Sequence, residues 1–573
     1  MKKILFTLFF FSLFIFSFSY CNGQNWMWGR EAIPKNDTLG GGEILGDHSV
    51  AIDNKGNAYA FGWFWGQITF GNDTIIANGE DLFLVKYDVN GSFIWVKQIK
   101  ENIAGGNDAN SVAVNDDGNI YITGYFNDTL SFGAIKLIST TSYNTFIAKY
   151  DTNGNFIWAK QATLANNGNS AIYASSLAAD NSGNIYVTGY FLDTVYFGAD
   201  KLKTSPNYLD FFLAKFNPNG NVVWAKQGVT AGSSSFDAST SIALDMDGNP
   251  FITGYFTHKL MIGNDTLITH CNNGDVFIAK YDSDGNILWV NKAKGKNDLC
   301  NGIPTSISID RYGDAYLTGY FSDTLSFGAN MLTSTTSFYN AFLVKYNGEQ
   351  GNVFWANQGE NIGVSSWAGY SVATDTTEGG GYLTMAAEIG PYQITFGKDS
   401  FNLNTTHLSA TIFLQFDSAG NTICGKIFTE GDEDDGDGVG LDHSGKFVYM
   451  SGDLYDTTIF GPDTLTYGYE LDNPFITRWQ SCSTIVTDIS QLKLNESIAA
   501  YPNPFRNYTT IVVNSDYKHY LELDDITGRK LKWFEFTGNK CELFSMGLAP
   551  GMYFVRVFDT SNTLLGTSKI IVQ

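Results

Sequence analysis

The sequence is dominated by a phrase of aromatic and β-branched residues that returns every 65 residues. The phrase reads "GNIYITGYFNDTLSFG" at residues 118–133, and close copies begin at Gly183, Gly248 and Gly313. A second phrase, "FIAKYDTNGNFIWAKQ" from Phe146, follows in the same unit, with copies from Phe83, Phe212, Phe277 and Phe342. Repetition at a fixed period of this length means that one supersecondary unit is stacked many times.

Three further copies bring the number of units to seven. The first unit contains residues 56–97, before the well-matched copies. The sixth has Met385 where the others have Gly, and Cys424 where they have Trp. The seventh contains residues 445–461 and stops at "FITRWQSC", before a fourth strand.

Each unit is expected to form four antiparallel strands, which in the second unit are residues 111–114, 120–126, 145–150 and 156–161. The turns "NDDGN" and "DTNGN" place Gly where a hairpin needs positive φ, and Asp or Asn where it can bond the turn backbone. The strands are apolar on both faces, so both faces must be covered. Small sheets packed around an axis meet that need. An all-β fold, a seven-bladed β-propeller, is therefore predicted, with a linear solenoid as the alternative.

The segment "QNWMWGREA" at residues 24–32 favours the ring over the solenoid. Aligned with "FIWAKQ", it puts Trp28 where other units have Trp and Arg30 where they have Lys. Because the last unit lacks its fourth strand, residues 25–31 are predicted to pair beside residues 475–479 as the outer strand of the seventh blade. That pairing would close the ring.

The units resemble bacterial propeller repeats of the SBBP kind. The phrases "SVAVNDDGNIYITG" and "TFIAKYDTNGNFIWAKQ" carry the resemblance, which extends over about residues 41–479. It implies a propeller domain, predicted at residues 24–481, and it implies no common activity.

After a predicted linker at residues 482–499, strands that alternate between apolar and polar residues predict a small β-sandwich at residues 500–573. This region resembles the type A C-terminal sorting domain of the type IX secretion system of Bacteroidetes. The matching residues are Tyr501, Pro502, Asn503, Pro504, Phe505, Asp525, Gly528, Gly551, Tyr553 and Lys569. The resemblance implies the type IX secretion machinery as partner, and a mature protein that is secreted or attached to the cell surface.

The first 23 residues have the pattern of a secretory signal, because Lys2 and Lys3 precede an apolar run. Cleavage is predicted between Gly23 and Gln24. An uncleaved membrane anchor is the alternative. No other stretch is long and apolar enough to span a bilayer, so no membrane span is expected in the mature protein.

The net charge and the cysteine positions exclude some classes of ligand. A formal net charge of −23 argues against nucleic acid, which would be repelled. Five cysteines remain once Cys21 leaves with the signal, and they show no metal-binding spacing: Cys271, Cys300, Cys424, Cys482 and Cys541. Cys271 could form a disulfide with Cys300, but a hydrophobic core of this size is stable without disulfides, and none is predicted.

Catalytic and cofactor motifs are missing from the sequence, so no catalytic residue and no cofactor are predicted. His48 and His443 lie next to predicted inner strands and are expected to be solvated or bonded within turns. Turn formation is likewise the expected role of Asp88, Asp151 and Asp282, although "D-x-N-G-x-x-x-W" is similar to a sialidase Asp-box.

The acidic run "GDEDDGDG" offers weak candidate ligands for Ca²⁺, namely Asp432, Asp434, Asp435 and Asp437. A solvated acidic loop is the favoured interpretation.

Asp-Thr pairs recur and resemble the O-glycosylation motif of exported Bacteroidetes proteins. The candidate threonines are Thr74, Thr129, Thr194, Thr266, Thr324 and Thr464, and the same pair occurs at Thr38, Thr376 and Thr457. A turn that starts the next strand is the favoured explanation of the pattern.

These features favour a non-enzymatic surface or secreted propeller that binds a glycan or a protein through loops at one end of the channel. Trp63, Trp65 and Trp367 are candidate residues for stacking on sugars. Two alternatives stay open: a propeller hydrolase that acts on polysaccharide, and a structural or adhesive surface protein.

Overall fold

The computed structural model describes most of the chain as strands and turns. The described residues are 26–34, 40–43, 49–101, 108–165, 170–205, 208–230, 236–269, 274–295, 301–334, 338–361, 367–375, 380–388, 393–396, 399–402, 409–427, 435–454, 458–460, 462–465, 473–480, 498–501, 503–513, 517–525, 530–545, 548–559 and 564–572. Within these ranges the fold is all-β, and no helix is long and apolar enough to cross a membrane. Contacts divide the chain into two compact units, residues 1–483 and 484–573.

Each repeat forms a four-stranded antiparallel sheet, and we number the repeats 1 to 7 along the chain. Repeat 1 contains β4 (Val50–Ile52), β5 (Ala58–Phe70), β6 (Asp73–Tyr87) and β7 (Phe93–Glu101). Repeat 2 contains β8 (Asp108–Val114), β9 (Ile120–Phe132), β10 (Ile135–Tyr150) and β11 (Phe156–Gln161). Repeat 3 contains β13 (Ala171–Ala179), β14 (Ile185–Leu192), β17 (Leu209–Phe216) and β18 (Val222–Gln227).

Repeats 4 to 7 follow the same plan. Repeat 4 contains β20 (Asp237–Leu244), β21 (Pro250–Phe256), β24 (Asp275–Tyr281) and β25 (Ile287–Lys292). Repeat 5 contains β27 (Asn301–Ile309), β28 (Ala315–Ser322), β31 (Asn340–Tyr346) and β32 (Val353–Asn361). Repeat 6 contains β33 (Trp367–Thr374), β34 (Gly381–Glu388), β37 (Ser409–Phe416) and β38 (Thr422–Ile427). Repeat 7 contains β39 (Asp435–Leu441), β40 (Phe447–Leu454) and β43 (Asn473–Gln480), completed by β1 (Trp26–Glu31).

Short strands lie beyond the four-stranded sheets, and some of them link neighbouring repeats. They are β2 (Ile33–Pro34), β3 (Gly40–Glu43), β12 (Thr163–Leu164), β15 (Thr194–Phe197), β16 (Asp200–Lys203), β19 (Val229–Thr230), β22 (Lys259–Ile262), β23 (Asp265–Ile268), β26 (Lys294–Gly295), β29 (Thr324–Phe327), β30 (Asn330–Thr333), β35 (Gln393–Phe396), β36 (Asp399–Asn402), β41 (Thr458–Phe460) and β42 (Asp463–Leu465). After the outer strand of repeat 2 the chain crosses over, and β12 pairs with β15 of repeat 3. The strand pairs β19 with β22, and β26 with β29, repeat this crossing.

The hairpin turns form as the sequence predicts. Gly91 and Gly154 have φ of 76° and 75°, in the left-handed region that favours glycine. The Oδ1 atom of Asp151 accepts the backbone N–H groups of Asn153 and Asn155 at 2.9 and 2.8 Å. Asp88 and Asp282 accept the equivalent pairs of bonds, which confirms the turn-forming role of these three residues.

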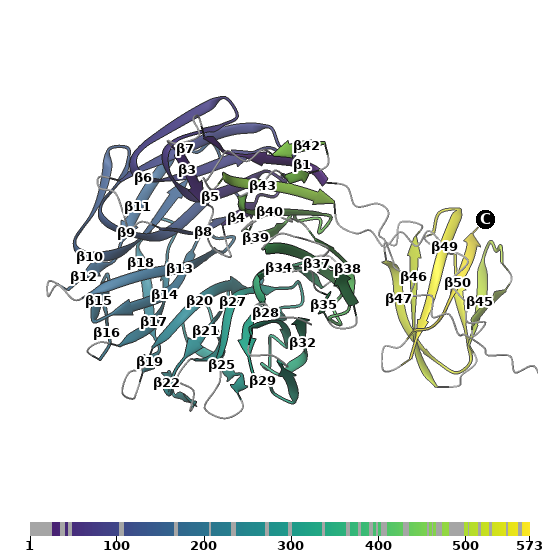
Figure 1. The fold of residues 1–573 in the computed structure, drawn as a ribbon. Helices are drawn as coiled ribbons and strands as arrows, with labels where there is room; N and C mark the ends of the chain where they lie inside the picture. The colour runs from purple at the N-terminus through teal and green to yellow at the C-terminus, as the bar shows by residue number, and fades with distance from the viewer. Residues whose placement is uncertain are drawn as a thin grey trace, which may run out of the picture. The chain divides into compact units, whose positions relative to one another are not determined.

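The first strands of the repeats lie side by side around a common axis (Figure 1). Each contacts the next along the chain, from β4 through β8, β13, β20, β27 and β33 to β39, and β39 contacts β4. Serine hydroxyls link these strands: the Ser111 Oγ accepts the N–H of Leu177 at 3.2 Å, and the Ser241 Oγ accepts that of Ile307 at 3.0 Å. The small side chains therefore do more than fill a narrow axis, because they also satisfy backbone donors of the following repeat.

The N-terminal strand pairs with the last repeat as the sequence predicts. β1 runs antiparallel to β43, with Gly29 opposite Thr477 and Glu31 opposite Phe475. The chain then continues into β2, where Ile33 lies opposite Thr69 of β5 in repeat 1. This crossing from repeat 7 to repeat 1 has the same form as the crossings between consecutive repeats.

The C-terminal unit is built from two sheets. One contains β44 (Ile498–Tyr501), β45 (Tyr508–Val513) and β48 (Lys540–Phe544), and the other contains β47 (Lys530–Thr537), β46 (Lys518–Asp525), β49 (Gly551–Phe558) and β50 (Leu564–Val572). Apolar side chains from both sheets share one core, among them Ile511, Leu521 and Val555.

Candidate functional site

A cluster of four tyrosines lies at the end of repeats 2 and 3 where their first strands begin. Tyr125 is in β9, Tyr143 in β10, Tyr173 in β13 and Tyr190 in β14. The ring of Tyr125 lies 5.6 Å from that of Tyr143 and 5.1 Å from that of Tyr173, and Tyr173 stacks on Tyr190 at 4.9 Å. All four side chains are half-buried, so each presents part of a ring to solvent.

Hydrogen bonding and burial fix this cluster in place. The Tyr125 hydroxyl donates to Oδ2 of Asp108 in β8 at 2.8 Å. Burial raises the pKa of the Asp108 carboxyl, against the lowering effect of that bond. Burial also raises the pKa of Tyr190 to about 12. The Tyr190 hydroxyl therefore stays neutral at physiological pH. The four rings offer apolar surfaces with hydroxyl edges.

The same strand position carries an aromatic residue in the first five repeats. It is the residue after the recurring Gly of the phrase: Trp63, Tyr125, Tyr190, Tyr255 and Tyr320. The rings of Trp63 and Trp65 lie 5.4 Å apart and are half-buried, and both residues pair with β3. Trp367 lies in β33, and its side chain is outside the described residues. Trp63 and Trp65 are predicted candidates for binding, whereas the tyrosines are not, although the recurring "TGY" indicates them.

Two fully buried carboxyl groups lie at the edge of this region. Asp237 in β20 accepts the N–H of Thr257 at 3.3 Å, and its Oδ2 has no hydrogen-bond partner. Burial raises the pKa of Asp237 to about 9, and the charge of Asp210 adds to the shift. Asp210 accepts the N–H of Thr230 at 3.1 Å, and burial raises the pKa of Asp210 to about 6. Both side chains are 0% exposed, so a substrate cannot reach them. Their hydrogen bonds to Thr230 and Thr257 favour a structural role.

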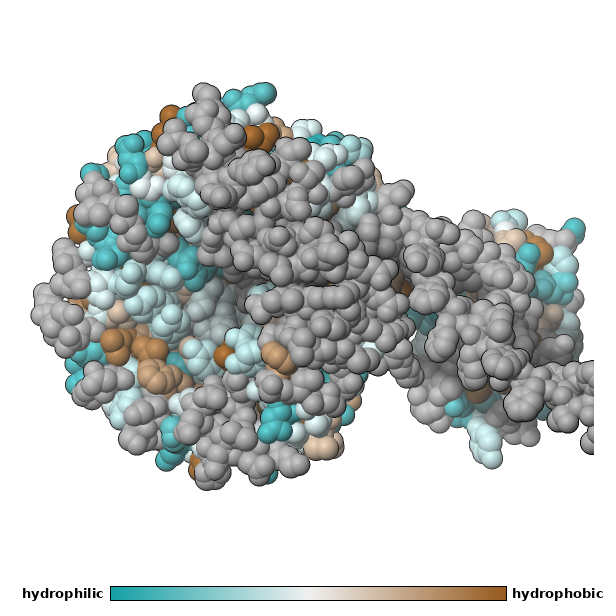
Figure 2. Space-filling model, in the orientation of Figure 1, coloured by the Kyte–Doolittle hydropathy of each residue, from teal (hydrophilic) through white to brown (hydrophobic). Residues whose placement is uncertain are grey.

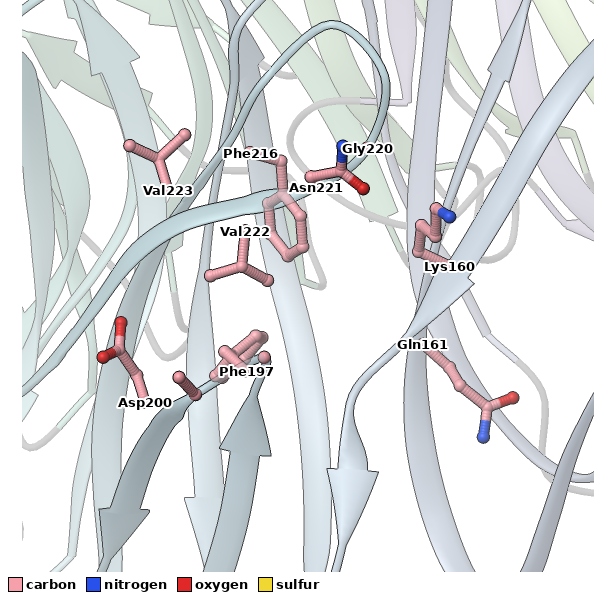
Figure 3. Close-up of a pocket in the computed structure, with 11 residues that line it drawn as sticks. Lys160, Gln161, Phe197, Asp200, Phe216, Gly220, Asn221, Val222 and Val223 are labelled. Carbon is pink, nitrogen blue, oxygen red and sulfur yellow. The ribbon is translucent and has the colours of Figure 1, made fainter.

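An open pocket of about 450 Å³ lies between the outer strands of repeats 2 and 3. Phe197, Phe216 and Val222 form its apolar wall, with Lys160 and Asp200 on opposite sides (Figure 3). The Asp200 carboxylate accepts the N–H of Ala225 at 2.9 Å and so covers a donor of the edge strand β18. On the face shown in Figure 2, hydrophobic residues form small groups between hydrophilic ones.

The predicted metal ligands and histidines do not form a binding site among the described residues. Asp435 and Asp437 lie in β39, while Asp432 and Asp434, like His48, fall outside the described residues. In the described ranges no group of three or more His, Cys, Asp or Glu side chains is placed to hold a metal ion. His443 is exposed in the turn after β39, with its Nε2 3.6 Å from the Asp116 carboxylate.

The Asp-Thr pairs fall into two structural classes. In the first, Thr129, Thr194 and Thr324 follow an Asp with φ of 62° to 67°, and each hydroxyl donates to that Asp at 2.9 to 3.2 Å. Thr194 and Thr324 are 7% and 5% exposed, which leaves no room for a glycan in the folded protein. For these two residues the turn explains the pattern.

The second class consists of Thr74, Thr266 and Thr464, which are exposed on hairpins. Glycosylation of these three stays a prediction, which an intact-mass measurement on protein from the native host tests. Thr38, Thr376 and Thr457 lie outside the described residues, as do Gly23 and Gln24 at the predicted signal cleavage site.

Five of the ten sorting-motif residues lie on strands of the C-terminal unit: Tyr501, Asp525, Gly551, Tyr553 and Lys569. The Asn503 side chain binds β50 twice, donating to the Lys569 carbonyl at 2.6 Å and accepting the N–H of Ile571 at 2.8 Å. Phe505 is buried, and the Tyr553 hydroxyl donates to the Ala549 carbonyl at 2.7 Å. Tyr501, Pro504, Gly551 and Lys569 are exposed. Asp525 ends β46, its side chain not described, and Pro502 and Gly528 are outside the described residues.

The sequence leaves the disulfides undetermined. In the structure Cys424 in β38 is disulfide-bonded. Cys541 in the C-terminal unit is a free thiol, and the other cysteines lie outside the described residues.

Comparison with known proteins gives two family matches. Residues 499–573 match a secretion system C-terminal sorting domain, and residues 157–190 match a β-propeller repeat. An uncharacterized WD repeat-containing protein of Acanthamoeba polyphaga mimivirus is 28% identical over 249 residues, which are 37% of this chain and 17% of that protein.

Solved structures resemble the chain only distantly. A member of the DUF4221 family from Bacteroides vulgatus is 11% identical, with a TM-score of 0.29, over 66% of this chain and 98% of that one. A putative dipeptidyl aminopeptidase IV from Bacteroides ovatus is 8% identical, with a TM-score of 0.32, over 85% of this chain and 67% of that one. Similarities this low carry no argument about function. The two family matches identify the chain as a secreted or cell-surface protein with β-propeller repeats and a type IX C-terminal sorting domain.

Proposed function

We propose that the mature protein is a closed seven-bladed β-propeller, at residues 24–481, that binds a glycan without catalysing a reaction. In this proposal the ligand lies on the tyrosine cluster formed by Tyr125, Tyr143, Tyr173 and Tyr190. Residues 482–499 act as a linker, and residues 500–573 direct type IX export. The clustered, half-buried tyrosine rings are the observation that carries the proposal.

Closure of the ring is supported by contacts that repeat 7 makes with repeat 1. The Trp28 indole N–H donates to the Val89 carbonyl at 3.2 Å, as the Trp158 indole donates to the Pro218 carbonyl between repeats 2 and 3. Arg478 donates to the same Val89 carbonyl at 2.7 Å. A linear solenoid would leave these partners on opposite ends of the array.

The tyrosine cluster matches the chemistry of a sugar ring. A pyranose has an apolar C–H face and a rim of hydroxyl groups, and tyrosine offers an apolar ring face with one hydroxyl. The cluster spans two neighbouring repeats, so it is wider than one aromatic side chain and can accept more than one sugar residue. Asp108 already accepts from Tyr125, which orients the hydroxyl edge of the cluster.

A hydrolase is the competing function, because two buried carboxyl groups with raised pKa values are also what acid–base catalysis requires. Asp210 and Asp237 are 0% exposed, however, and Asp210 is occupied by bonds from Thr230 and Gln227. That burial favours a structural role for the pair, and binding without turnover is the better-supported proposal.

The test is a glycan-array screen of the full chain, followed by calorimetric titration with the best ligand. The double variant Tyr143→Ala, Tyr173→Ala is expected to bind about five- to 150-fold more weakly, since each lost stacking contact is worth about 0.5–1.5 kcal/mol. Tyr312→Ala is the matched control, because Tyr312 is 65% exposed in a turn at the other end of the sheets. No glycan binding by the wild type, or wild-type affinity in a folded double variant, would refute the proposal.

A further inference from the structure

The outer strand of repeat 2 begins with an aromatic ring that packs against two others. Phe156 is the first residue of β11 and lies opposite Tyr150 of β10. Its ring stacks on that of Phe132 at 5.5 Å and meets that of Tyr150 edge-on at 5.7 Å. Phe93 occupies the same position in repeat 1, with its ring 6.2 Å from that of Tyr87. The repeat therefore has a place for a phenyl ring at the start of its outer strand.

In repeat 3 the equivalent residue is a valine, and the open pocket lies there. Val222 begins β18 opposite Phe216, in the same register as the phenylalanine of repeat 2. The two flanking rings are kept by Phe197 and Phe216, which lie 6.1 Å apart. All three residues line the pocket of about 450 Å³ (Figure 3). Because valine is smaller than phenylalanine, the pocket has room for the ring that repeat 2 supplies from its own chain.

Two opposite charges flank this apolar wall. Lys160 of β11 and Asp200 of β16 lie on opposite sides of the pocket (Figure 3). At the equivalent position in repeats 1 and 3, the ammonium groups of Lys97 and Lys226 lie 5.4 and 6.0 Å from the ring of the tryptophan two residues earlier. Among the described residues the Lys160 ammonium has no hydrogen-bond, ion-pair or ring partner, so it is available to an anion.

The junction of repeats 4 and 5 shares the valine but not the charges. Val353 begins β32 in the position of the phenylalanine. Asn291 stands where the pocket has Lys160, and Asn330 stands where it has Asp200. The Asn291 side chain also donates to a backbone carbonyl of the following turn at 2.9 Å. The junction of repeats 2 and 3 thus combines an apolar pocket with a cation and an anion, and the junction of repeats 4 and 5 offers a matched comparison.

We propose that this pocket binds an aromatic side chain of a peptide that carries an acidic residue on one side of the ring and a basic residue on the other. The ring packs against Phe197 and Phe216, as the chain's own phenylalanine packs in repeat 2. The acidic residue pairs with Lys160 and the basic residue with Asp200. Burial of the ring supplies most of the affinity, and the exposed ion pairs fix the orientation. No residue of the tyrosine cluster lines the pocket, so this site is separate from the proposed glycan site.

Calorimetric titration of the full chain with the acetylated and amidated tripeptides Glu-Phe-Lys and Lys-Phe-Glu tests the site, since the two orders cover both chain directions. One of them is expected to bind at one site per chain. It should bind about 10- to 150-fold more tightly than the same peptide with alanine in place of phenylalanine, because one phenyl ring is buried. Binding of neither peptide, or equal affinity for the alanine peptide, would overturn the proposal. Equal affinity for Ala-Phe-Ala would overturn the pairing with the two charges.

Variants of the pocket give a second test. Val222→Phe places in the pocket the ring that repeats 1 and 2 carry at this position, so the variant should fold and bind the peptide at least about tenfold more weakly. Val353→Phe makes the same change in repeat 5 and is the matched control, which should bind as the wild type does. Lys160→Met removes one charge and should weaken binding about two- to fivefold. Wild-type affinity in a folded Val222→Phe variant, or an equal loss in Val353→Phe, would overturn the proposal.

Discussion

The recurring glycine of the repeat is required by a close approach of two backbones. Gly189 in β14 faces a bulge in β13, where the register shifts between Ala174 and Ser176. A Cβ on Gly189 would lie 2.0 Å from the Tyr173 carbonyl oxygen. In repeat 6 the glycine is on the other strand, since Gly369 lies opposite Met385. One strand of the pair is therefore without a side chain at this point in both repeats.

Replacing this glycine should be costly even with the smallest side chain. Gly189→Ala is expected to lower the free energy of unfolding by about 2–4 kcal/mol, because the carbonyl it meets belongs to a buried strand. Denaturant titration measures the loss. Gly440→Ala is the control, since its Cβ would meet Ile52 at an ordinary 3.5 Å, and an equal loss there would contradict the steric explanation.

The buried carboxyl of Asp237 predicts a pH dependence of stability. Its pKa is about 9 in the folded chain and about 3.9 in an unfolded one. The folded state therefore keeps a proton that the unfolded state loses, and stability falls as pH rises from about 4 to 9. Asp237→Asn should be more stable than the wild type at pH 8, and the advantage should vanish near pH 4.

Thermal unfolding between pH 4 and 9 measures this difference. Asp265→Asn, which removes an exposed carboxylate from the hairpin of β22 and β23, is the control and should follow the wild type. An Asp237→Asn curve parallel to the wild type would show that this carboxyl does not titrate as described.

At the scale of strands, the outer strand holds each sheet to the next one. Trp224 in β18 is buried, donates to the Ser283 carbonyl at 3.2 Å and covers Gly285 of the following turn. Lys215 donates to the same carbonyl at 2.7 Å. One turn thus receives two donors from the preceding sheet.

Loss of this contact should destabilise the repeats. Trp224→Ala is expected to reduce the free energy of unfolding by about 3–5 kcal/mol, the usual cost of removing a buried tryptophan. Trp533→Ala in the C-terminal unit is the control, because that side chain is 60% exposed. Calorimetry of both variants gives the comparison, and equal midpoints for Trp224→Ala and wild type would contradict the interface.

The main strands could be predicted from the sequence because alternating and apolar runs are bounded by Gly-containing turns. The structure extends the predicted strand at residues 120–126 to Phe132 in β9. The crossing strands, such as β12 with two residues, could not be predicted. Strands this short carry no periodicity and are fixed by partners such as Tyr196 and Val195 in another repeat.

At the scale of the whole molecule, the repeat alone predicts the class of fold. The unpaired tryptophan-containing segment at the N-terminus predicts the pairing of β1 with β43. The candidate site is less visible. Tyr143 and Tyr173 come from different repeats and meet only in the folded chain, with rings 5.4 Å apart. The disulfide of Cys424 could not be predicted from the number and spacing of cysteines alone. Cys424 stands where the other repeats have a tryptophan, and spacing does not show this.

Ring closure is tested most directly by deleting residues 24–32 and adding them back as a synthetic peptide. Trp28 is 3% exposed and Ala32 is 1% exposed, so the deletion uncovers the core between repeats 7 and 1. A closed ring predicts that the unfolding midpoint falls by about 5–10 °C and that the peptide restores it in a saturable way. An unchanged midpoint, with no binding of the peptide, would contradict closure by the N-terminal strand.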